Sequence, residues 1–545
     1  MSFIAIAAVI GLAFLIWDCV EVGRNDATNL VNAVFGARVL SRRKAIVIAG
    51  IAVILGAAFS SPVMETTRKG IFDPMVLTVG MALSIYISVY FVDTILLYGF
   101  SGFGMPVSTT ACLVFELVGA SLFVAGPENV NWPKVGTVVL GIFVSIVVSG
   151  IASFLVMRVF RGAIRDKSED TATLLLHGPW IAGVILTWLT WFMVFKGLKN
   201  VTLVADVKTK VFQTYGEGLV LLVLWAGFTF LVHMLLVITH RRYAKYLFHA
   251  TAVLGMICMA FAFGQNDLAN AASPGLAGLE IWKHTADVSA SADIVSEIPM
   301  SQIVDADIEL RPGMWALAGC GILMASGMFT TYAQRVTRAA VNTGSEYDSV
   351  ALYAPEWCRK IARAFIRFRP AGPSLAQEAH LNSAGKKVHY DSIRASVITA
   401  VSGSVIAFAS GRGLPVSTTY VAFAAILGTG LSDRVFVRGD ADLKLGRAIW
   451  VVSCWVIAPI IAIVATGTIA TIVYRLSTVG IVIAIGINFF ARFYLKKRSD
   501  KHEDTYHLSA LDEDEEEEEN GDNSPDVQQQ DEVLAGAEED TEEPE

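Results

Sequence analysis

Charged residues are scarce in this chain of 545 residues. Only 17% of the residues are charged, whereas 54% are hydrophobic and the mean hydropathy is +0.55; soluble domains carry about 25% charged residues. A water-soluble core stops growing near ~250–300 residues, so it cannot hide this much apolar surface. The composition excludes a soluble enzyme and a disordered protein, and it indicates a chain that crosses a membrane several times.

Cysteines are few and are not arranged for metal or disulfide chemistry. The six cysteines fall mostly singly within apolar runs, without a C-x-x-C or C-x-x-H spacing, which excludes a zinc site and a disulfide framework. The sequence also lacks a recognisable nucleophile–base pair and a nucleotide-binding loop. We therefore expect no enzymatic activity, no cofactor and no nucleic-acid partner.

Basic residues are missing from the end of the chain. Residues 503–545 contain 20 Asp and Glu but no Lys or Arg, so the net charge of −8 becomes +12 for the rest of the chain. The tail cannot bury apolar area, because a run of glutamates at 515–519 is followed mainly by polar residues and Pro. We predict a solvated, disordered acidic tail over 499–545, in preference to a docking segment.

Long apolar runs fill the rest of the chain, and a membrane span needs about 20 such residues. The first run has no basic segment before it and no cleavage site, so we interpret it as a span rather than a signal peptide. The prediction is an all-α polytopic membrane protein with about 12–13 transmembrane helices, some of them discontinuous or re-entrant. The candidate spans lie near 2–22, 45–62, 74–97, 108–126, 135–158, 179–197, 216–240, 247–264, 312–334, 393–410, 417–430, 447–474 and 478–495.

The loops between these spans differ in charge. Counting crossings from the N-terminus places the basic segments at 38–44, 158–167, 241–245 and 335–394 on one side. Basic loops stay in the cytoplasm. We therefore expect a multi-pass protein of the cell membrane (plasma or inner membrane), with its N-terminus outside and the long basic loop 335–392 in the cytoplasm.

Two motifs occur twice, in the same order. G-R-N-D-A-T-N at 23–29 matches G-Q-N-D-L-A-N at 264–270, and P-V-S-T-T occurs at 106–110 and 415–419. The first motif helix should run inward and its second copy outward, because six predicted spans, an even number, lie between them. Inverted repeats of this kind are typical of secondary transporters, which bind substrate between the repeats.

The repeat defines the expected domains. Asp26 and Pro106 are 80 positions apart, whereas Asp267 and Pro415 are 148 apart, and two long loops in the second copy account for the difference to within a few residues. We predict a first repeat over 1–160, linker helices with scaffold or dimer contacts over 161–246, a second repeat over 247–475 with enlarged loops at 279–312 and 335–392, and a final helix over 476–498.

Carboxylates within these apolar helices indicate a cation site. Placing one inside a bilayer costs roughly 2.5–3.5 kcal/mol. The Asn-Asp pair in each motif disfavours a continuous helix, so we expect a local break that exposes carbonyl oxygens next to the carboxylate. The alternative, a polar cap at the membrane surface, explains the duplication poorly. The predicted cation ligands are Asp26, Asn29, Asp267 and Asn270.

The P-V-S-T-T elements favour an anion instead. Pro and Ser or Thr are typical of a helix start, and a helix N-terminus at membrane depth offers free backbone N–H groups and a positive dipole end. Glycines before each element favour a re-entrant hairpin over a Pro-kinked ordinary helix. Together, the four motifs resemble those of the inorganic phosphate transporter family, over roughly 1–160 and 247–475.

The resemblance implies a cation-coupled carrier and a dimer with a scaffold and a moving transport part. It also implies sodium at Asp26 and Asp267. Which groups contact the anion and which contact the cations is assigned only loosely. The substrate-binding residues that the resemblance nominates are Ser108, Thr109, Thr110, Ser417, Thr418, Thr419, Asn25 and Asn266.

Arg24 departs from the family pattern, which often has a small residue at this position. It could pair with Asp18 or Glu21, reach the anion as a bidentate ligand, or replace one coupling cation. Three further polar residues within apolar runs, Asp93, Glu116 and His233, are expected to be satisfied packing or gating groups rather than proton relays.

The predicted function is import of inorganic phosphate, coupled to Na⁺ or H⁺, by alternating access. Moving one charge across ~100 mV is worth about 2.3 kcal/mol, so at least two cations are needed to draw a phosphate anion into a negative cell. The alternatives are a permease of the same fold for sulfate or another tetrahedral oxyanion, and a passive anion channel. The expected partners are thus phosphate or sulfate, sodium ions, membrane lipid and a second copy of the chain.

Overall fold

All helices, loops and turns described below come from a computed structural model, and every regular element in its described parts is a helix. These parts are 3–57, 59, 70–164, 170–198, 201–239, 241–286, 296–302, 314–347, 349–367, 388–506 and 508. Within them, the only β-type pairings are two isolated bridges, Phe72 with Val130 and Thr78 with Pro299. The predicted all-α class is confirmed.

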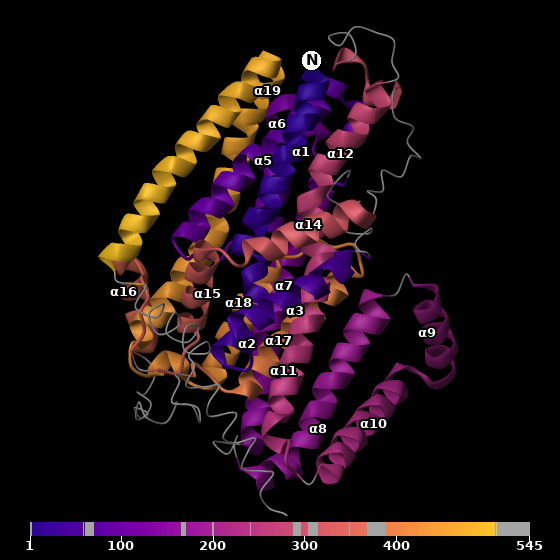
Figure 1. Ribbon diagram of the computed structural model, residues 1–545, viewed down its shortest axis with the longest axis vertical. Coiled ribbons are helices and arrows are strands. Elements are labelled where there is room, and N and C mark those ends of the chain that lie inside the picture. Colours follow the sequence, from indigo (N-terminus) through magenta and orange to yellow (C-terminus); the bar gives the residue numbers. More distant parts are fainter. Residues whose placement is uncertain are drawn as a thin grey trace, which may run out of the picture.

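The first half of the chain contributes one set of long helices and the second half another (Figure 1). The first set is α1 (Phe3–Asn25), α2 (Asn32–Gly36), α3 (Arg42–Ala57), α5 (Val79–Gly102), α6 (Thr109–Ala125) and α7 (Trp132–Ile164). The middle segment forms α8 (Thr171–Leu189), α9 (Thr202–Tyr215) and α10 (Glu217–Ile238). The second set is α11 (Leu247–Phe263), α12 (Ala269–Ala286), α14 (Met314–Gly327), α15 (Thr331–Thr343), α16 (Glu356–Ile366), α17 (Ser392–Ser410), α18 (Thr418–Ser432) and α19 (Ala441–Thr505).

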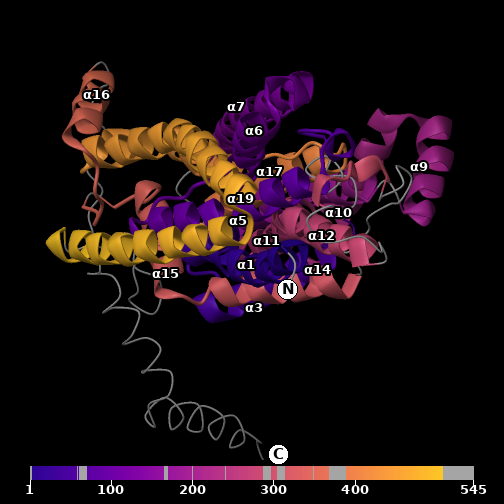
Figure 2. The same cartoon turned by 90° about the horizontal axis from the view of Figure 1, so that it is seen from above.

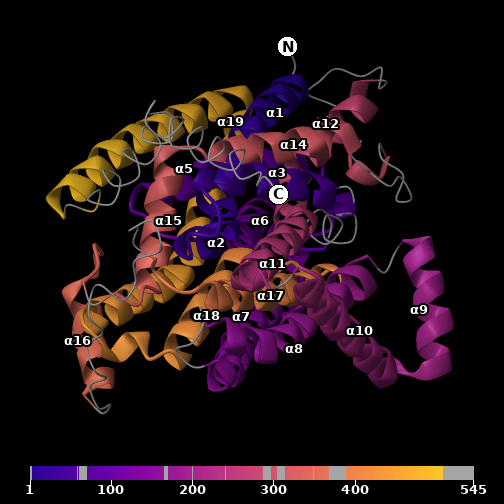
Figure 3. The same ribbon diagram turned by 60° about the horizontal axis from the view of Figure 1, so that its bottom comes forward.

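The two sets meet in the middle of the molecule. In Figure 1, α1 lies toward the end that carries the N-terminus, whereas α11 lies toward the opposite end. The middle helices α8, α9 and α10 stand to one side, as Figure 3 shows. The motif-bearing ends of α1 and α11 are therefore inside the bundle, where membrane transporters place their sites.

Fewer helices are long enough to cross a membrane than the predicted 12–13. In the described residues, eight are long and apolar enough, or nine if α14 and α15, bent by 71° at a short break, form one span. The apolar helices α6 and α18 are shorter, with 17 and 15 residues, as expected for re-entrant segments. The predicted spans 447–474 and 478–495 both lie within α19, which is kinked at Ser477.

The segments predicted at 312–334 and 335–392 differ from the structure. In place of one span, the chain forms the bent pair α14 and α15, and α15 continues to Thr343 inside the predicted loop. This loop also contains α16, while its residues 368–387 lie outside the described part. Residues 331–343 are helical because they form an amphipathic helix whose apolar side packs against α1 and α5. Charge and mean hydropathy alone do not reveal such a helix.

The second part of α19 returns along the bundle after the kink (Figure 2). Asn488 donates a hydrogen bond of 2.8 Å to the carbonyl oxygen of Phe91, and Leu495 packs against Gly99, so this part is attached to α5. The helix continues to Thr505, beyond residue 498 where the sequence places its end. Residues 499–505, which the sequence assigns to a disordered tail, are therefore helical, and most of the rest of the predicted acidic tail lies outside the described residues.

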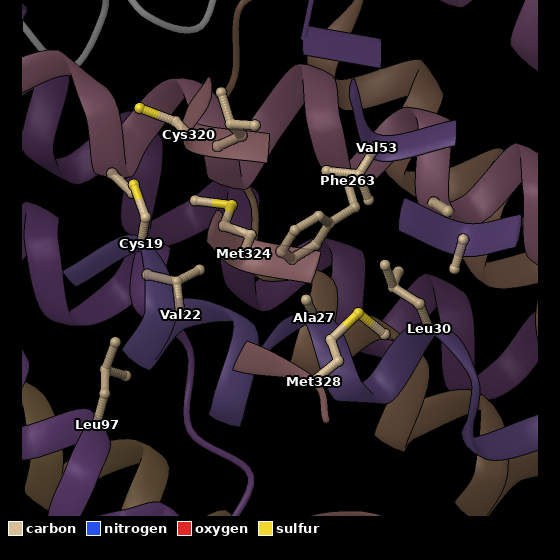
Figure 4. Close-up of a cluster of buried hydrophobic side chains, with 14 of the residues drawn as sticks. Cys19, Val22, Ala27, Leu30, Val53, Leu97, Phe263, Cys320, Met324 and Met328 are labelled. Atoms are coloured by element: carbon tan, nitrogen blue, oxygen red, sulfur yellow. The ribbon is translucent and has the colours of Figure 1, made fainter. Parts of the chain in front are cut away.

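Small and apolar residues hold the motif helices together. The cluster in Figure 4 brings Cys19 and Val22 of α1 close to Cys320 and Met324 of α14. A methyl group at Gly23 would lie 1.9 Å from the carbonyl oxygen of Met324, so these two helices touch through their backbones. Close approach at small residues is how membrane helices gain packing energy.

The second motif repeats this contact with the other helix set. A methyl group at Gly264 would lie 2.1 Å from the carbonyl oxygen of Val53 in α3. The first glycine of each motif thus seats its helix against a neighbour in the opposite half of the chain. The sequence pattern contains these glycines, but it does not reveal their partners.

Candidate functional site

Both N-D motifs interrupt the regular α-helix, as expected. In the first copy α1 ends at Asn25, and a 3-10 helix, Ala27–Leu30, follows Asp26. In the second copy the chain forms a π-helical turn, Gly264–Leu268. A 3-10 helix is tighter than an α-helix and a π-helical turn is wider, and π-helical turns are frequent at functional sites.

Each P-V-S-T-T element begins a helix after a tight turn. Gly104 and Gly413 occupy equivalent places in these turns and have φ angles of 62° and 67°, a region that favours glycine. Ser108 then caps α6 by accepting a hydrogen bond of 3.1 Å from the amide of Ala111, and Ser417 caps α18 in the same way. Both predicted helix starts are present, inside the bundle.

The first asparagine of each motif holds the hairpin turn of its own repeat. Asn25 Oδ1 accepts a hydrogen bond of 2.9 Å from the amide of Val107, and Asn266 Oδ1 accepts one of 3.3 Å from the amide of Val416. Asn25 also donates to the hydroxyl of Ser101. These side chains fix the distance between the motif turn and the helix start.

The aspartates, in contrast, bond across the repeats. Asp26 Oδ1 accepts hydrogen bonds from the hydroxyls of Thr418, at 3.2 Å, and Thr419, both from the second repeat. Asp267 Oδ1 accepts one of 2.7 Å from the hydroxyl of Thr110 of the first repeat. The carboxylate of each copy is therefore joined to the helix start of the other.

The last asparagine of each motif follows the same crossed pattern. Asn29 donates a hydrogen bond of 2.9 Å to the hydroxyl of Thr419, and Asn270 donates one of 2.9 Å to the hydroxyl of Thr110. The structure thus brings all the residues predicted to bind substrate or cations into one buried polar cluster, which we call the crossed site. They are Asn25, Asp26, Asn29, Ser108, Thr109, Thr110, Asn266, Asp267, Asn270, Ser417, Thr418 and Thr419, each at most 6% exposed.

The crossed site has negative charge without a basic partner. Among the described residues, neither Asp26 nor Asp267 forms an ion pair, and Asp267 Oδ2 has no hydrogen-bond partner. A buried charge is costly unless it is paired or coordinated. The described residues contain no cluster of three or more His, Cys, Asp or Glu fit for a metal ion. The remaining donors are hard amide, hydroxyl and carboxylate oxygens, which suit a small cation such as sodium.

Arg24 forms its contacts outside the crossed site. Its guanidinium forms an ion pair of 2.7 Å with Glu21 and donates to the hydroxyl of Thr330 at 3.2 Å. Arg492 from the second part of α19 also pairs with Glu21, at 2.6 Å. Of the three roles considered for Arg24, the geometry matches an ion pair with Glu21; it does not reach Asp18.

Three other predicted polar residues lie outside the crossed site. Asp93 and Glu116 are fully buried, and the carboxyl group of Asp93 lies beside that of Asp18. Their expected role as packing or gating groups stays a prediction. His233 is exposed on α10, away from the bundle interior.

The sequence analysis missed two residues that support the site. Ser101 accepts the amide hydrogen of Asn25, and Arg447 donates to the carbonyl oxygen of Gly104 at 2.5 Å, in the turn before α6. Neither residue belongs to a motif, and each lies within a long helix. The only hint in the sequence is the group of small residues before the first P-V-S-T-T element, which includes Ser101.

Comparison with known proteins identifies the family of this chain. The sequence profile described as "Phosphate transporter family" matches residues 22–345 and 381–466. The chain belongs to this family. The match contains both copies of both motifs, so the resemblance inferred from the motifs is confirmed.

Individual relatives are distant but similar in length. The chain is 25% identical to a "Putative phosphate permease" of Pyrococcus furiosus, over 83% of this chain and 92% of that protein. It is 27% identical to a protein of the same name from Pyrococcus abyssi, over 79% of this chain and 90% of that one. A solved structure entitled "The sodium-dependent phosphate transporter" has a similar fold, with a TM-score of 0.59 and 22% identity over 87% of this chain and 99% of that one.

Proposed function

We propose that this protein is a secondary active transporter that imports inorganic phosphate together with sodium ions. The observation that carries the proposal is the crossed pairing of Asp26 with Thr419 and of Asp267 with Thr110. A site between repeats, at broken helices, suits alternating access, because one repeat can rock against the other around it. Family membership supports phosphate as the substrate, and the name of the solved structure supports sodium.

The anion would bind between the first turns of α6 and α18. Both helices begin at the crossed site, and their positive dipole ends favour a tetrahedral oxyanion. The hydroxyls of Ser108, Thr109 and Ser417 add donors. Thr109 Oγ1 supports this role, because it is buried and has no hydrogen-bond partner.

The cations would bind at the motif turns and neutralise the two aspartates. Two sodium ions with a monoanionic phosphate carry a net charge of +1 inward, and each charge moved across ~100 mV contributes about 2.3 kcal/mol. In this proposal Asp26 and Asn29 hold one ion, while Asp267 and Asn270 hold the other. The proposed orientation places the N-terminus outside the cell, and the proposed assembly is a homodimer with contacts from 161–246.

The proposal is tested by uptake of radiolabelled phosphate into proteoliposomes. Uphill accumulation should require an inward sodium gradient and should be reduced at least about tenfold in T110V and T419V, since each loses bonds to charged and amide groups. T468V is the matched control, because the Thr468 hydroxyl bonds only to its own helix on the exposed side of α19. Flux without any cation gradient would indicate a passive channel and overturn the proposal.

Sulfate is the second substrate to be measured in the same assay. Phosphate can donate a hydrogen bond and sulfate cannot, so a carboxyl oxygen that receives no hydrogen bond from the protein, such as Asp267 Oδ2, favours phosphate. We expect excess unlabelled phosphate to abolish the signal and sulfate to leave most of it. Equal competition by sulfate would assign a general oxyanion permease.

A further inference from the structure

We propose that α16 is an interfacial helix that docks on an anionic phospholipid surface beside the start of α19. The helix contains eleven residues, Glu356–Ile366, and packs against α19. It belongs to none of the motifs and lies outside the crossed site. The proposal rests on its three distinct faces, on its position relative to α19 and on its charge.

The first face is an exposed apolar stripe. Trp357, Ile361 and Phe365 are four positions apart, so they lie along one side of the helix. They are 47%, 40% and 65% exposed, which is unusual for large apolar side chains in water. Helices with one apolar and one basic side lie in the membrane interface, with the apolar side buried among the acyl chains.

The second face is already occupied by protein. Cys358 and Ala362 are fully buried against α19, and the backbone of Arg359 lies 3.3 Å from the place of a Cβ atom on Gly446. Asp442 accepts hydrogen bonds from Arg359 at 2.9 Å and from Arg363 at 3.1 Å. Because this face is well packed, the exposed stripe is not a failed contact with α19.

The position of α16 points to lipid as the occupant of the stripe. Trp357 contacts Trp450 of α19, with ring centroids 6.1 Å apart. Along the same helix, Val452 and Val456 are exposed, as expected for a helix surface that faces acyl chains. The stripe therefore adjoins the lipid-facing surface of α19 at its beginning, where tryptophans mark the membrane boundary.

The third face supplies the charge that selects anionic lipid. Lys360 and Arg367 are exposed, and neither has an ion-pair partner among the described residues. At about 100° per residue, both lie roughly 100–120° around the helix from the middle of the stripe, on the side opposite the buried face. Basic side chains near a membrane surface are attracted by anionic headgroups. A second copy of the same basic helix would instead repel this face.

Docking would also affect the hairpin turn before α6. Arg447, in the second turn of α19, donates to the carbonyl oxygen of Tyr353, just before α16, and to that of Gly104. A helix anchored in the interface would hold this arginine and the turn in place. On the proposed function, phosphate uptake would then be faster in membranes that contain anionic lipid.

The test uses the full chain in nanodiscs, with a fluorophore attached to F365C. R367C is the matched control from the basic face of α16, and the unmodified chain gives the background from native cysteines. We expect a quencher attached to lipid tails to act on the label at 365 about threefold more strongly than at 367, and aqueous iodide to show the reverse. Both residues are exposed, so neither substitution should prevent folding.

Charge dependence completes the test. A second protein carries K360Q and R367Q in addition to F365C. In discs with anionic lipid, the lipid quencher should act less on this protein than on F365C alone, because each charge removed should weaken docking about fivefold. In discs of neutral lipid alone, lipid quenching of the label at 365 should be equally low with and without K360Q and R367Q. Equal iodide quenching at positions 365 and 367 would overturn the proposal. Protection of the label at 365 from both quenchers would also overturn it, because it would show that protein covers the stripe. Neither measurement requires transport, so this outcome is independent of the proposed function.

Discussion

The two halves of the crossed site have the same plan but are not equally satisfied. Asp26 accepts hydrogen bonds from Thr418, Thr419 and the amide of Thr109, at both of its carboxylate oxygens. Asp267 accepts one, from Thr110, and its Oδ2 has none. The duplicated motif therefore produced one carboxylate held by the protein and one that still has a free coordination position.

This difference predicts a division of labour between the two carboxylates. A buried carboxylate oxygen without a donor gains more from a bound cation than one that is already hydrogen-bonded. We therefore expect Asp267 to dominate the sodium affinity and Asp26 to contribute more to holding the repeats together. Pairs of matched substitutions can test this division.

The largest effect is expected from neutralising the aspartates. D267N should raise the sodium concentration needed for half-maximal phosphate uptake by about 100-fold, because a buried charge contact of this kind is worth ~3 kcal/mol. D26N should raise it less but should lower the thermal stability more. Sodium titrations of uptake and thermal unfolding in detergent measure the two effects. Equal sodium titrations for D267N and the wild type would contradict the assignment.

Replacing Thr110, which bonds to Asp267, should slow phosphate uptake more than replacing Thr419, which bonds to Asp26. T110V removes the hydroxyl donor to Asp267 and the acceptor for Asn270, whereas after T419V Asp26 keeps its bond to Thr418. We expect about tenfold slower uptake in T419V and a larger loss in T110V, since unsatisfied buried groups cost ~1–3 kcal/mol. Initial uptake rates of purified variants, with T468V as the control, measure the ranking. If T419V were the slower protein, the proposed asymmetry would be wrong.

Alanine substitutions in the two hairpin turns should have more similar effects than the substitutions of the aspartates and threonines. Gly104 and Gly413 have nearly the same positive φ, so alanine should destabilise each turn by about 1–2 kcal/mol. At Gly104 a methyl group would also lie 2.9 Å from the carbonyl oxygen of Arg335, which should add to the loss. Thermal unfolding of both variants measures this. G136A is the control, because Gly136 has no neighbour within 4 Å.

The far end of α18 carries a support that is sensitive to pH. Arg394 is fully buried and donates to the carbonyl oxygens of Gly344 and Ile426, with Glu346 3.5 Å away. Burial raises the pKa of Glu346 from 4.5 to about 7, although the Arg394 guanidinium acts in the opposite direction. The folded protein thus binds this proton more tightly than the unfolded chain does.

The smallest effect follows from this pKa. Glu346 should contribute stability that is fully present below pH 4.5 and is lost as the pH rises toward about 7, because the unfolded carboxyl releases its proton first. E346Q should make the melting temperature less dependent on pH in this window. Unfolding curves of both proteins across it provide the measurement, and parallel curves would show that Glu346 does not titrate as stated.

Much of this protein could be predicted without coordinates. Apolar runs located the long helices, and the duplicated N-D and S-T-T motifs identified residues that the fold does bring together. The prediction erred at residues 312–343, where a short break with a 71° bend turns one apolar run into two helices. A bend of this kind depends on the helices packed on both sides, which the local sequence does not encode.

The sequence alone determined the membrane class, the two copies of the motif and the identity of the polar residues, because hydropathy and repetition are properties of the chain itself. Only the tertiary structure decided that each aspartate bonds to the threonine of the other copy, and that Asp26 is better satisfied than Asp267. It also decided that Arg24 pairs with Glu21, which Arg492 binds as well. These contacts join residues up to hundreds of positions apart, so they arise from how the helices pack and not from any local pattern.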